Sequence, residues 1–243
     1  MSTLPGSFNR LKKGNRRAAL LLHGMSSSPW EMSSLASALF KAGWDVYCPL
    51  LADFKEWEGR FGGFSWEYWF NAAQQVLSPL KGRYRRIVVI GTSLGGVLAG
   101  LLCARNPWVR SCVMVNPPFR YRGLLVHLVL GMRGIIKKIP IKIAAGYEDK
   151  YFPYFPVVAI RELGRLAKEV MAEAQKIRQS LLIYHTAGDR TVSKRGIDLF
   201  LRSAGSRHKE FKVVERGPHS LLAPYNKNNS IIFGEILRFI DTN

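Results

Sequence analysis

Apolar residues in this 243-residue chain form two kinds of pattern, which alternate along most of its length. One is a short run of consecutive apolar residues, many of them β-branched, which is typical of a strand buried on both faces. The other repeats apolar residues every three or four positions, which is typical of an amphipathic helix. The strand-like runs cover residues 18–24, 44–50, 85–91, 110–116, 180–188 and 210–215. The helix-like segments begin at Pro29, Ser65, Ser93, Ser193 and Ser230.

This alternation predicts an α/β fold with one mostly parallel sheet. A helix between two strands returns the chain to the same end of the sheet, so the two strands run in parallel. Strands that are apolar on both sides need helices on both faces of the sheet. The length of the chain is sufficient for one sizeable core, and we therefore expect a single domain over residues 1–243.

The alternation is interrupted between residues 117 and 179, immediately before the last two predicted strands. Two apolar and basic segments with helical spacing, residues 123–140 and 156–177, lie in this interval. An interval this long is unusual for a loop within one sheet, and its apolar content favours packing against the rest of the domain. We therefore predict that residues 117–179 form a small helical cap.

The sequence predicts neither a membrane span nor a secretory signal. No apolar run approaches the length of about 18 residues that a transmembrane helix needs, and the N-terminus is polar and then basic. The three cysteines, Cys48, Cys103 and Cys112, lie in apolar contexts without the spacing of metal ligands. We expect reduced and buried thiols, a cytoplasmic location and no bound metal.

The charge of the chain is strongly positive, because 36 Lys and Arg residues against 17 Asp and Glu residues give a formal net charge of +19. Such a charge favours anionic partners. The basic residues are scattered, and no nucleic-acid-binding signature gathers them on one surface, so we predict no nucleic-acid partner. Peripheral contact of the cap with anionic membranes remains a hypothesis. The residues that would carry it are Arg133, Lys137 and Lys138 beside Ile135 and Ile136.

Residues 91–95 read Gly-Thr-Ser-Leu-Gly and lie between a predicted strand and a predicted helix. The pattern G-x-S-x-G at such a place is typical of a nucleophile elbow, a sharp turn that exposes a serine hydroxyl above the sheet. Glycines permit the turn because they lack side chains that would clash. A phosphate-binding glycine turn is the alternative, but the Walker lysine and the dinucleotide-binding spacing are missing. We therefore predict that Ser93 is a nucleophile.

A serine nucleophile needs a base, and His219 is the best-placed histidine. It lies in the loop after the last predicted strand, at the carboxyl edge of the sheet where Ser93 is also expected. An exposed loop histidine without a catalytic role is the alternative. The other histidines are His23 at the end of the first strand, His127 in the insertion, His185 within a strand and His208 in a polar turn.

Asp189 is the predicted partner of this histidine, because it directly follows the strand at residues 180–188 and falls on the same edge. The resulting order along the chain, serine then aspartate then histidine, is the order of the nucleophile-elbow architecture. An aspartate that only stabilises its turn is the alternative. Rival positions are Asn116, which cannot carry a charge, Asp149 in the insertion, Asp198 within a helix and Glu215 close to the histidine.

Acyl transfer also requires N–H donors for the oxyanion that forms on the attacked carbonyl. The backbone N–H of Leu94 follows the nucleophile at the positive end of its helix. The backbone N–H of Met25 lies on the turn after the first strand. We predict that these two groups form the oxyanion hole.

Four motifs in order along the chain, LLLHGM, GTSLGG, AGDRTV and GPHSLL, resemble those of the α/β-hydrolase fold. More narrowly, they resemble the small bacterial carboxylesterase and monoacylglycerol lipase group, from residue 16 to the final helix. Val192 after the aspartate, and Trp66 and Trp69 before the nucleophile strand, match this group as well. The chain departs from it in PLLADFKEWEG, where a Gly-His-Gly turn is common, and in Arg-Gly-Pro-His, where Ser-Gly-His is usual.

The predicted residues would form an acyl-enzyme without a metal or an organic cofactor. The resemblance implies a carboxylic ester hydrolase whose substrates are small-molecule or lipid esters with medium or longer acyl chains, or monoacylglycerols. Cap leucines could line an acyl pocket or could form the core of the cap itself. They are Leu124, Leu125, Leu128 and Leu130. A thioesterase, a C–C hydrolase, an acyltransferase or a catalytically silent binding protein are the alternatives, and the oligomeric state stays open.

Overall fold

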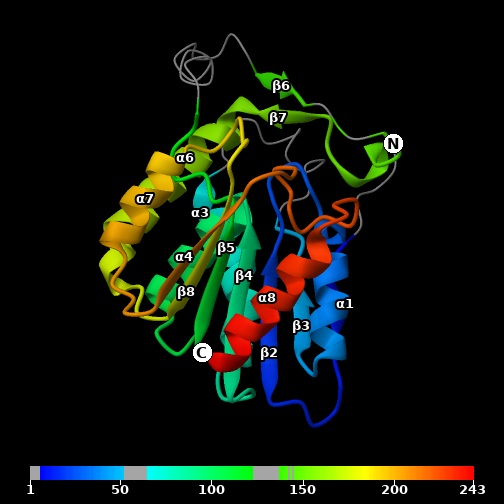
Figure 1. Cartoon of the computed structure of the whole chain (residues 1–243), viewed down its shortest axis with the longest axis vertical. Coiled ribbons are helices and arrows are strands. Elements are labelled where there is room, and N and C mark those ends of the chain that lie inside the picture. Colours follow the sequence, from blue (N-terminus) through cyan, green and yellow to red (C-terminus); the bar gives the residue numbers. More distant parts are fainter. Residues whose placement is uncertain (1–5, 52–64, 123–136, 142, 144) are drawn as a thin grey trace.

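The computed structural model describes residues 6–51, 65–122, 137–141, 143 and 145–243. In this part of the chain a seven-stranded sheet runs through the middle of the molecule, with helices on both faces (Figure 1). The strand order across the sheet is β1-β3-β2-β4-β5-β8-β9. All neighbouring strands are parallel except β1, which is antiparallel to β3. The predicted mostly parallel α/β sheet is confirmed.

The helices and strands begin and end within a few residues of the predicted ones. The strands of the sheet are β1 (Phe8–Arg10), β2 (Arg17–Leu22), β3 (Asp45–Cys48), β4 (Arg86–Thr92), β5 (Ser111–Val115), β8 (Ser180–Thr186) and β9 (Lys209–Val214). The α-helices are α1 (Ser33–Lys41), α3 (Trp66–Leu77), α4 (Leu94–Arg105), α6 (Val157–Glu173), α7 (Lys194–Ser203) and α8 (Asn229–Thr242). Strand β1 was not predictable from the sequence, because three residues are too few to show an apolar pattern.

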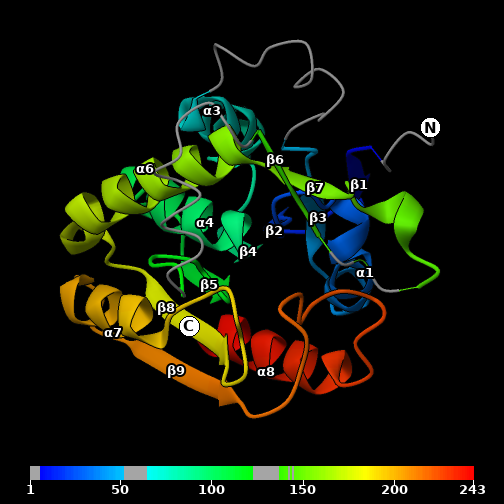
Figure 2. The ribbon, with the colours of Figure 1, turned by 90° about the horizontal axis from the view of Figure 1, so that it is seen from above.

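Two apolar cores lie on the two faces of the sheet, because successive side chains of a strand point to opposite faces. Leu20 and Val89 pack in the core that includes α3, α4, α6 and α7. Their neighbours Leu21 and Ile90 pack in the core that includes α1 and α8. Figure 2 shows α3, α4 and α6 on one side of the strands and α1 and α8 on the other. The near-continuous apolar strands of the sequence are therefore covered on both faces.

Helix α4 lies between the sheet and α6, in the middle of one helical layer (Figure 2). Every residue from Leu94 to Ala104 is buried, which explains why the sequence of this helix has no polar face. Contacts on all sides fix the position of the helix. The first turn of α4, and with it the preceding Ser93, is therefore held firmly at the end of β4.

The segment between β5 and β8, predicted as a cap, supplies both a hairpin and a helix. Strands β6 (Lys138–Pro140) and β7 (Tyr154–Pro156) pair antiparallel and cross above the carboxyl ends of the sheet strands (Figure 1). Helix α6 follows and packs through Leu166 and Val170 in the same core as α4. Part of this segment thus belongs to the helical layer that covers the sheet, and the role of residues 117–179 as a cap stays a prediction.

The helical prediction for residues 123–140 is wrong at its end. Lys138–Pro140 form strand β6, because a residue before proline disfavours the helical conformation and β7 offers a partner for pairing. Several predicted features lie outside the described residues: they are His127, Leu124, Leu125, Leu128, Leu130, Arg133, Ile135 and Ile136. None of the helices in the described part of the chain combines the length and the apolar character of a membrane span.

Candidate active site

Ser93 lies at the sharp turn between β4 and α4, as the sequence motif predicts. Its backbone has φ 52° and ψ −119°, which is strained for any residue other than glycine. The Ser93 N–H donates a 2.8 Å hydrogen bond to the carbonyl of Val115 at the end of β5. The neighbouring strand thus helps to hold the strained serine in place.

The two glycines of the motif allow backbone segments to approach each other closely around Ser93. A Cβ atom on Gly91 would lie 2.0 Å from the carbonyl oxygen of Gly95. A Cβ atom on Gly95 would lie 2.1 Å from the carbonyl oxygen of Leu22 in β2. Because the obstacle is backbone in both cases, a side chain at either position would push the start of α4 away from the sheet.

Asp189 and His219 are joined by a hydrogen bond of 2.6 Å between Oδ2 and Nδ1. The side chain of Asp189 is 1% exposed and that of His219 is 31% exposed. The other carboxylate oxygen, Oδ1, accepts the backbone N–H groups of Thr191 (2.7 Å) and Val192 (3.0 Å), which orient the carboxylate. Burial alone would raise the pKa of Asp189, but the hydrogen bond and charge interaction with His219 and the two N–H donors bring it below its usual value.

The loop that carries His219 is held by Asn116 at the end of β5. Asn116 is fully buried, and its Nδ2 donates hydrogen bonds to the carbonyl of His219 (2.7 Å) and to the hydroxyl of Thr186 (3.1 Å). Its Oδ1 accepts the N–H of Thr186 at 2.8 Å. Asn116, a rival to Asp189 for the position of the acid, therefore connects β5, β8 and the histidine loop instead. The sequence offered no signal for this role, because His219 is 103 residues away along the chain.

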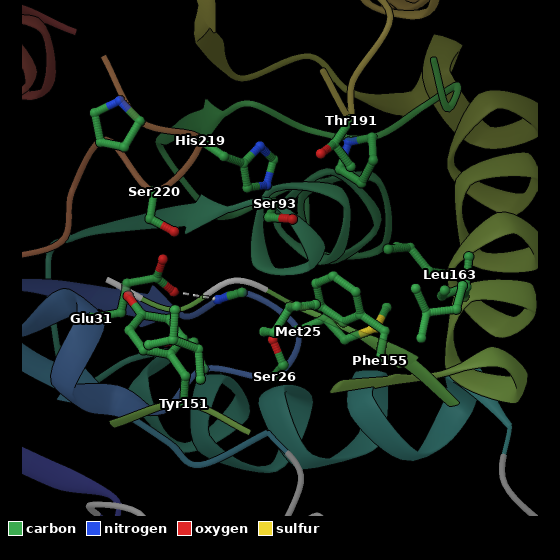
Figure 3. A pocket seen from close by; sticks show the side chains of 18 of the residues that line it. Met25, Ser26, Glu31, Ser93, Tyr151, Phe155, Leu163, Thr191, His219 and Ser220 are labelled. Carbon is green, nitrogen blue, oxygen red and sulfur yellow. Dashed lines mark hydrogen bonds between the residues drawn. The ribbon is translucent and has the colours of Figure 1, made fainter. Parts of the chain in front are cut away.

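Ser93 and His219 line the same pocket, and the imidazole points toward Ser93 in Figure 3. Since Nδ1 of His219 is occupied by Asp189, the nitrogen left to face the serine is Nε2. Within the residues that the structure describes, no hydrogen bond joins the Ser93 hydroxyl to the imidazole. Hydrogen bonds of this kind are often long in a structure without substrate.

The turn after β2, which carries Met25, is fixed from two sides. Nδ1 of His23 lies 2.8 Å from the carbonyl of Gly24, and Nε2 accepts the N–H of Leu51 at 3.1 Å, so the proton must be on Nδ1. Burial lowers the pKa of His23 to about 4, which keeps the ring neutral at neutral pH. The carboxylate of Glu31 accepts the N–H of Gly24 at 2.8 Å. Met25 therefore lies on a rigid turn at the wall of the pocket.

Leu94, the second predicted donor, is the first residue of α4. A helix leaves the N–H groups of its first turn without an acceptor of its own, and the helix dipole is positive at this end. The backbone N–H of Leu94 therefore has the character that an oxyanion requires. Met25 lines the pocket itself, whereas Leu94 adjoins it through Ser93.

The pocket has a volume of about 600 Å³ and two chemically different ends. In Figure 3, Phe155 and Leu163 lie on one side of Ser93, and Glu31 and Tyr151 lie on the other. Glu31 and Tyr151 were not predicted as pocket residues from the sequence. Glu31 reads as an ordinary exposed position of an amphipathic helix, and nothing in the sequence brings Tyr151 to the sheet edge.

In the part of the chain that the structure describes, no three His, Cys, Asp or Glu side chains are arranged to hold a metal ion. Cys48, Cys103 and Cys112 are free and buried, as the sequence predicts. Burial raises the pKa of the thiols of Cys48 and Cys103. These two thiols are therefore protonated at neutral pH.

Comparison with known proteins agrees with the observed fold. A thermostable monoacylglycerol lipase from Bacillus sp. (strain H-257) is 24% identical over 213 residues, which cover 86% of this chain and 84% of that protein. A structure from work on the metagenome-derived lipolytic enzymes LipS and LipT superposes with a TM-score of 0.86 at 22% identity, over 99% of this chain and 100% of that one. The monoacylglycerol lipase of Paleococcus ferrophilus superposes with a TM-score of 0.74 at 14% identity, over 96% and 98% of the two chains. Residues 19–225 match the alpha/beta hydrolase family, and the chain therefore belongs to that family.

Proposed function

We propose that this protein is a serine hydrolase that cleaves carboxylic esters through an acyl-enzyme. Ser93 is the nucleophile, His219 the general base and Asp189 the group that orients the histidine. The observation that carries the proposal is the 2.6 Å bond between Asp189 and His219, in a place where His219 and the strained Ser93 open into one pocket. The family and the lipase relative from Bacillus support ester hydrolysis.

In the first half of the reaction, the Ser93 hydroxyl attacks the ester carbonyl while Nε2 of His219 takes its proton. Asp189 keeps the other proton on Nδ1 and stabilises the imidazolium. The substrate oxyanion accepts hydrogen bonds from the N–H groups of Met25 and Leu94. His219 then gives its proton to the leaving alcohol, and the acyl group stays on the serine.

In the second half, water attacks the acyl-serine ester while His219 takes a proton from it. The tetrahedral intermediate again places its oxyanion at Met25 and Leu94. When it collapses, the bond to the serine oxygen breaks, His219 returns its proton to that oxygen, and the carboxylic acid leaves. The rigid turn around Met25 supports its role, since donors that are already oriented cost no reorganisation during the reaction.

The substrates that we propose are esters with medium or longer acyl chains, or monoacylglycerols. Ile139, Phe155 and Leu163 form an apolar wall of the pocket, and the cavity volume of about 600 Å³ suits a lipid-sized ligand. The Bacillus relative is a monoacylglycerol lipase. These wall residues come from β6, β7 and α6, which supports the role of residues 117–179 as a cap over the site.

The test is a panel of p-nitrophenyl esters of increasing acyl length, run beside acyl-CoA thioesters with the wild type and Ser93→Ala. We expect hydrolysis of medium or longer esters and a loss of at least about 10³-fold in the variant. Undiminished activity of Ser93→Ala would mean that another residue is the nucleophile. Faster hydrolysis of the thioesters than of any ester would favour a thioesterase instead.

We further propose a cytoplasmic location and peripheral contact with anionic lipid surfaces. Lys137 and Lys138 are exposed and directly precede Ile139, which lines the pocket, and the chain carries a net charge of +19. A basic surface beside an apolar entrance is suited to a negatively charged membrane. Sedimentation with lipid vesicles tests this contact, and binding that does not rise with the anionic lipid content would contradict it.

A further inference from the structure

The polar end of the pocket contains a buried carboxylate that the proposed reaction does not use. Glu31 lies in the short 3₁₀ turn Pro29–Met32, lines the pocket and is 1% exposed. Oε2 accepts the N–H of Gly24, and among the described residues no basic side chain forms an ion pair with this carboxylate. Lys150, whose backbone lies near Ser28, pairs with Asp149 instead. A buried carboxylate with so few donors is costly unless a ligand supplies more of them.

Hydroxyl groups from four other residues line this end of the pocket together with Glu31. They belong to Ser27, Tyr151, Ser220 and Tyr225. The Tyr151 hydroxyl interacts with the hydroxyls of Ser27 and Tyr225, but within the described residues neither the Ser27 nor the Tyr151 hydroxyl makes a hydrogen bond of normal geometry. Burial and the nearby charge of Glu31 raise the pKa of Tyr151, so its hydroxyl keeps its proton. Buried hydroxyls without a well-formed hydrogen bond, beside a buried carboxylate, indicate a place where a polar ligand is received.

The position of Ser93 between the two ends decides which part of an ester reaches this place. An ester whose acyl chain lies along Phe155 and Leu163, with its carbonyl carbon at Ser93, directs its alcohol toward Glu31 and Tyr151 (Figure 3). The apolar end suits the acyl chain, because a buried carboxylate is a poor neighbour for methylene groups.

We propose that the polar end, formed by Glu31, Ser27 and Tyr151, selects a leaving alcohol that carries further free hydroxyl groups. This inference rests on the proposed ester hydrolysis. A hydroxyl of the alcohol donates to Oε1 of Glu31, which accepts no hydrogen bond from the described residues, and the hydroxyls of Ser27 and Tyr151 bind the next one as donor or acceptor. A cationic alcohol would also suit a carboxylate, but Arg190 lines the same pocket and the chain has a net charge of +19, and both repel a cation.

Glu31 also holds Gly24, the residue before Met25, so a role in positioning the oxyanion turn has to be separated from recognition of the alcohol. Positioning alone affects every ester to the same extent. Recognition affects only esters whose alcohol carries hydroxyl groups. The ratio between two esters that share an acyl chain therefore distinguishes the two roles.

The experiment compares kcat/KM for 1-decanoylglycerol and propyl decanoate, which share an acyl chain and a three-carbon alcohol and differ by the free hydroxyls. We expect the wild type to prefer the glyceryl ester at least about tenfold, because a site built to bind hydroxyls rejects an analogue without them. In Glu31→Gln, which keeps an oxygen for the N–H of Gly24, the ratio should fall to about threefold or less. Tyr151→Phe should lower the ratio by a smaller factor.

The matched control is Glu162→Gln on α6. Glu162 is also a buried glutamate that accepts a backbone N–H, from Trp66 at 3.1 Å, but it does not line the pocket. In Glu162→Gln, the ratio of kcat/KM for 1-decanoylglycerol to kcat/KM for propyl decanoate should equal that of the wild type. A loss of preference in this variant as large as in Glu31→Gln would overturn the inference.

Four other outcomes would also overturn it. Equal kcat/KM for the two esters in the wild type, or an equal loss for both in Glu31→Gln, would reject alcohol selection while leaving ester hydrolysis intact. A clear preference for choline decanoate over the glyceryl ester would identify a cation site instead. Failure to hydrolyse any of the three esters would reject the proposed function itself, and the inference with it.

Discussion

The two sides of the pocket are built in different ways. On one side, Ser93, Asp189 and His219 follow β4, β8 and β9, which belong to one sheet. Hydrogen bonds across strand ends tie this side together, including those of Asn116 and the Ser93 N–H. We call it the sheet side. Its geometry is fixed by a core that surrounds the strands on both faces.

On the other side, the described residues of 137–163 form the hairpin β6–β7 and the first turns of α6. We call this the cover. It meets the sheet side through apolar packing of the first turns of α6 in the core that contains α4. The hairpin adds hydrogen bonds such as the 2.8 Å bond from the N–H of Phe152 to the carbonyl of Ser26. For the proposed reaction we expect a division of labour, in which the sheet side determines whether a bond is cleaved and the cover determines which acyl chain fits. Substitutions on the sheet side should therefore affect all esters alike, and substitutions in the cover should affect esters according to their acyl length.

The largest expected effect comes from Asp189→Asn on the sheet side. Asparagine can still accept the N–H groups of Thr191 and Val192, so the loop should keep its shape. Its amide would face Nδ1 of His219 and favour the wrong tautomer, and we expect kcat to fall by about 10⁴-fold for every ester. Asp198→Asn on α7 is the control, since Asp198 pairs with Lys194 at the surface and does not line the pocket. A loss confined to long-chain esters would contradict the division between the two sides.

Next in size is the effect of a single methyl group on stability. Gly95→Ala would bring a Cβ within 2.1 Å of a β2 carbonyl, and we expect it to lower the free energy of unfolding by at least about 3 kcal/mol. Gly164→Ala in α6 is the matched change near the cover, because its Cβ meets no atom within 4 Å. It should raise stability by about 0.5–1 kcal/mol, as alanine does in a helix. Urea unfolding measures the free energy of unfolding of both variants. Equal changes in the two variants would contradict the expected difference between the two positions.

The same contrast explains what the sequence could predict. Ser93 directly follows the apolar strand β4, and Asp189 and His219 lie in the loops after β8 and β9. Parallel strands present their carboxyl ends at one edge, so the order of strands along the chain brings the three residues together. The central strands were recognisable because they are buried on both faces, whereas the edge strand β9 is partly exposed. The structure agrees with the expected pairing of Asp189 with His219.

The cover and the polar end of the pocket could not be predicted in this way. Lys138–Pro140 lie in a segment with helical spacing, but they form a strand because β7 happens to be available as a partner. Asn116 and Glu31 act through contacts with residues whose position depends on the whole fold. Neither periodicity nor motif spacing carries information on such contacts.

A smaller expected effect concerns the pH dependence of the free energy of unfolding, to which His23 on the sheet side contributes. His23 has a pKa of about 4 in the folded protein and about 6.5 when unfolded, so only the unfolded chain takes up a proton between these values. The free energy of unfolding should therefore fall by about 1.4 kcal/mol per pH unit as the pH drops through this window, and this contribution levels off below pH 4. His185, whose pKa burial also lowers, acts in the same direction.

Urea unfolding of the wild type and His23→Gln between pH 7 and pH 4 measures this contribution. The variant should lose the part of the slope that corresponds to one proton. His208→Gln is the control, because the His208 side chain is 51% exposed and lies before β9, away from the site. A slope in His23→Gln equal to that of the wild type would show that the acid sensitivity originates elsewhere.

The smallest expected effect belongs to the cover. Phe155 on β7 lines the apolar end of the pocket, and Phe155→Ala removes a ring that an acyl chain would contact. Because the lost contact lies along the chain and away from the carbonyl, kcat/KM should fall about threefold to tenfold for a decanoyl ester and hardly at all for an acetyl ester. Leu199→Ala, which truncates an exposed side chain on α7, should leave both esters unchanged. An equal loss for acetyl and decanoyl esters would mean that the cover also positions the reacting groups, and the separation between the two sides would no longer hold.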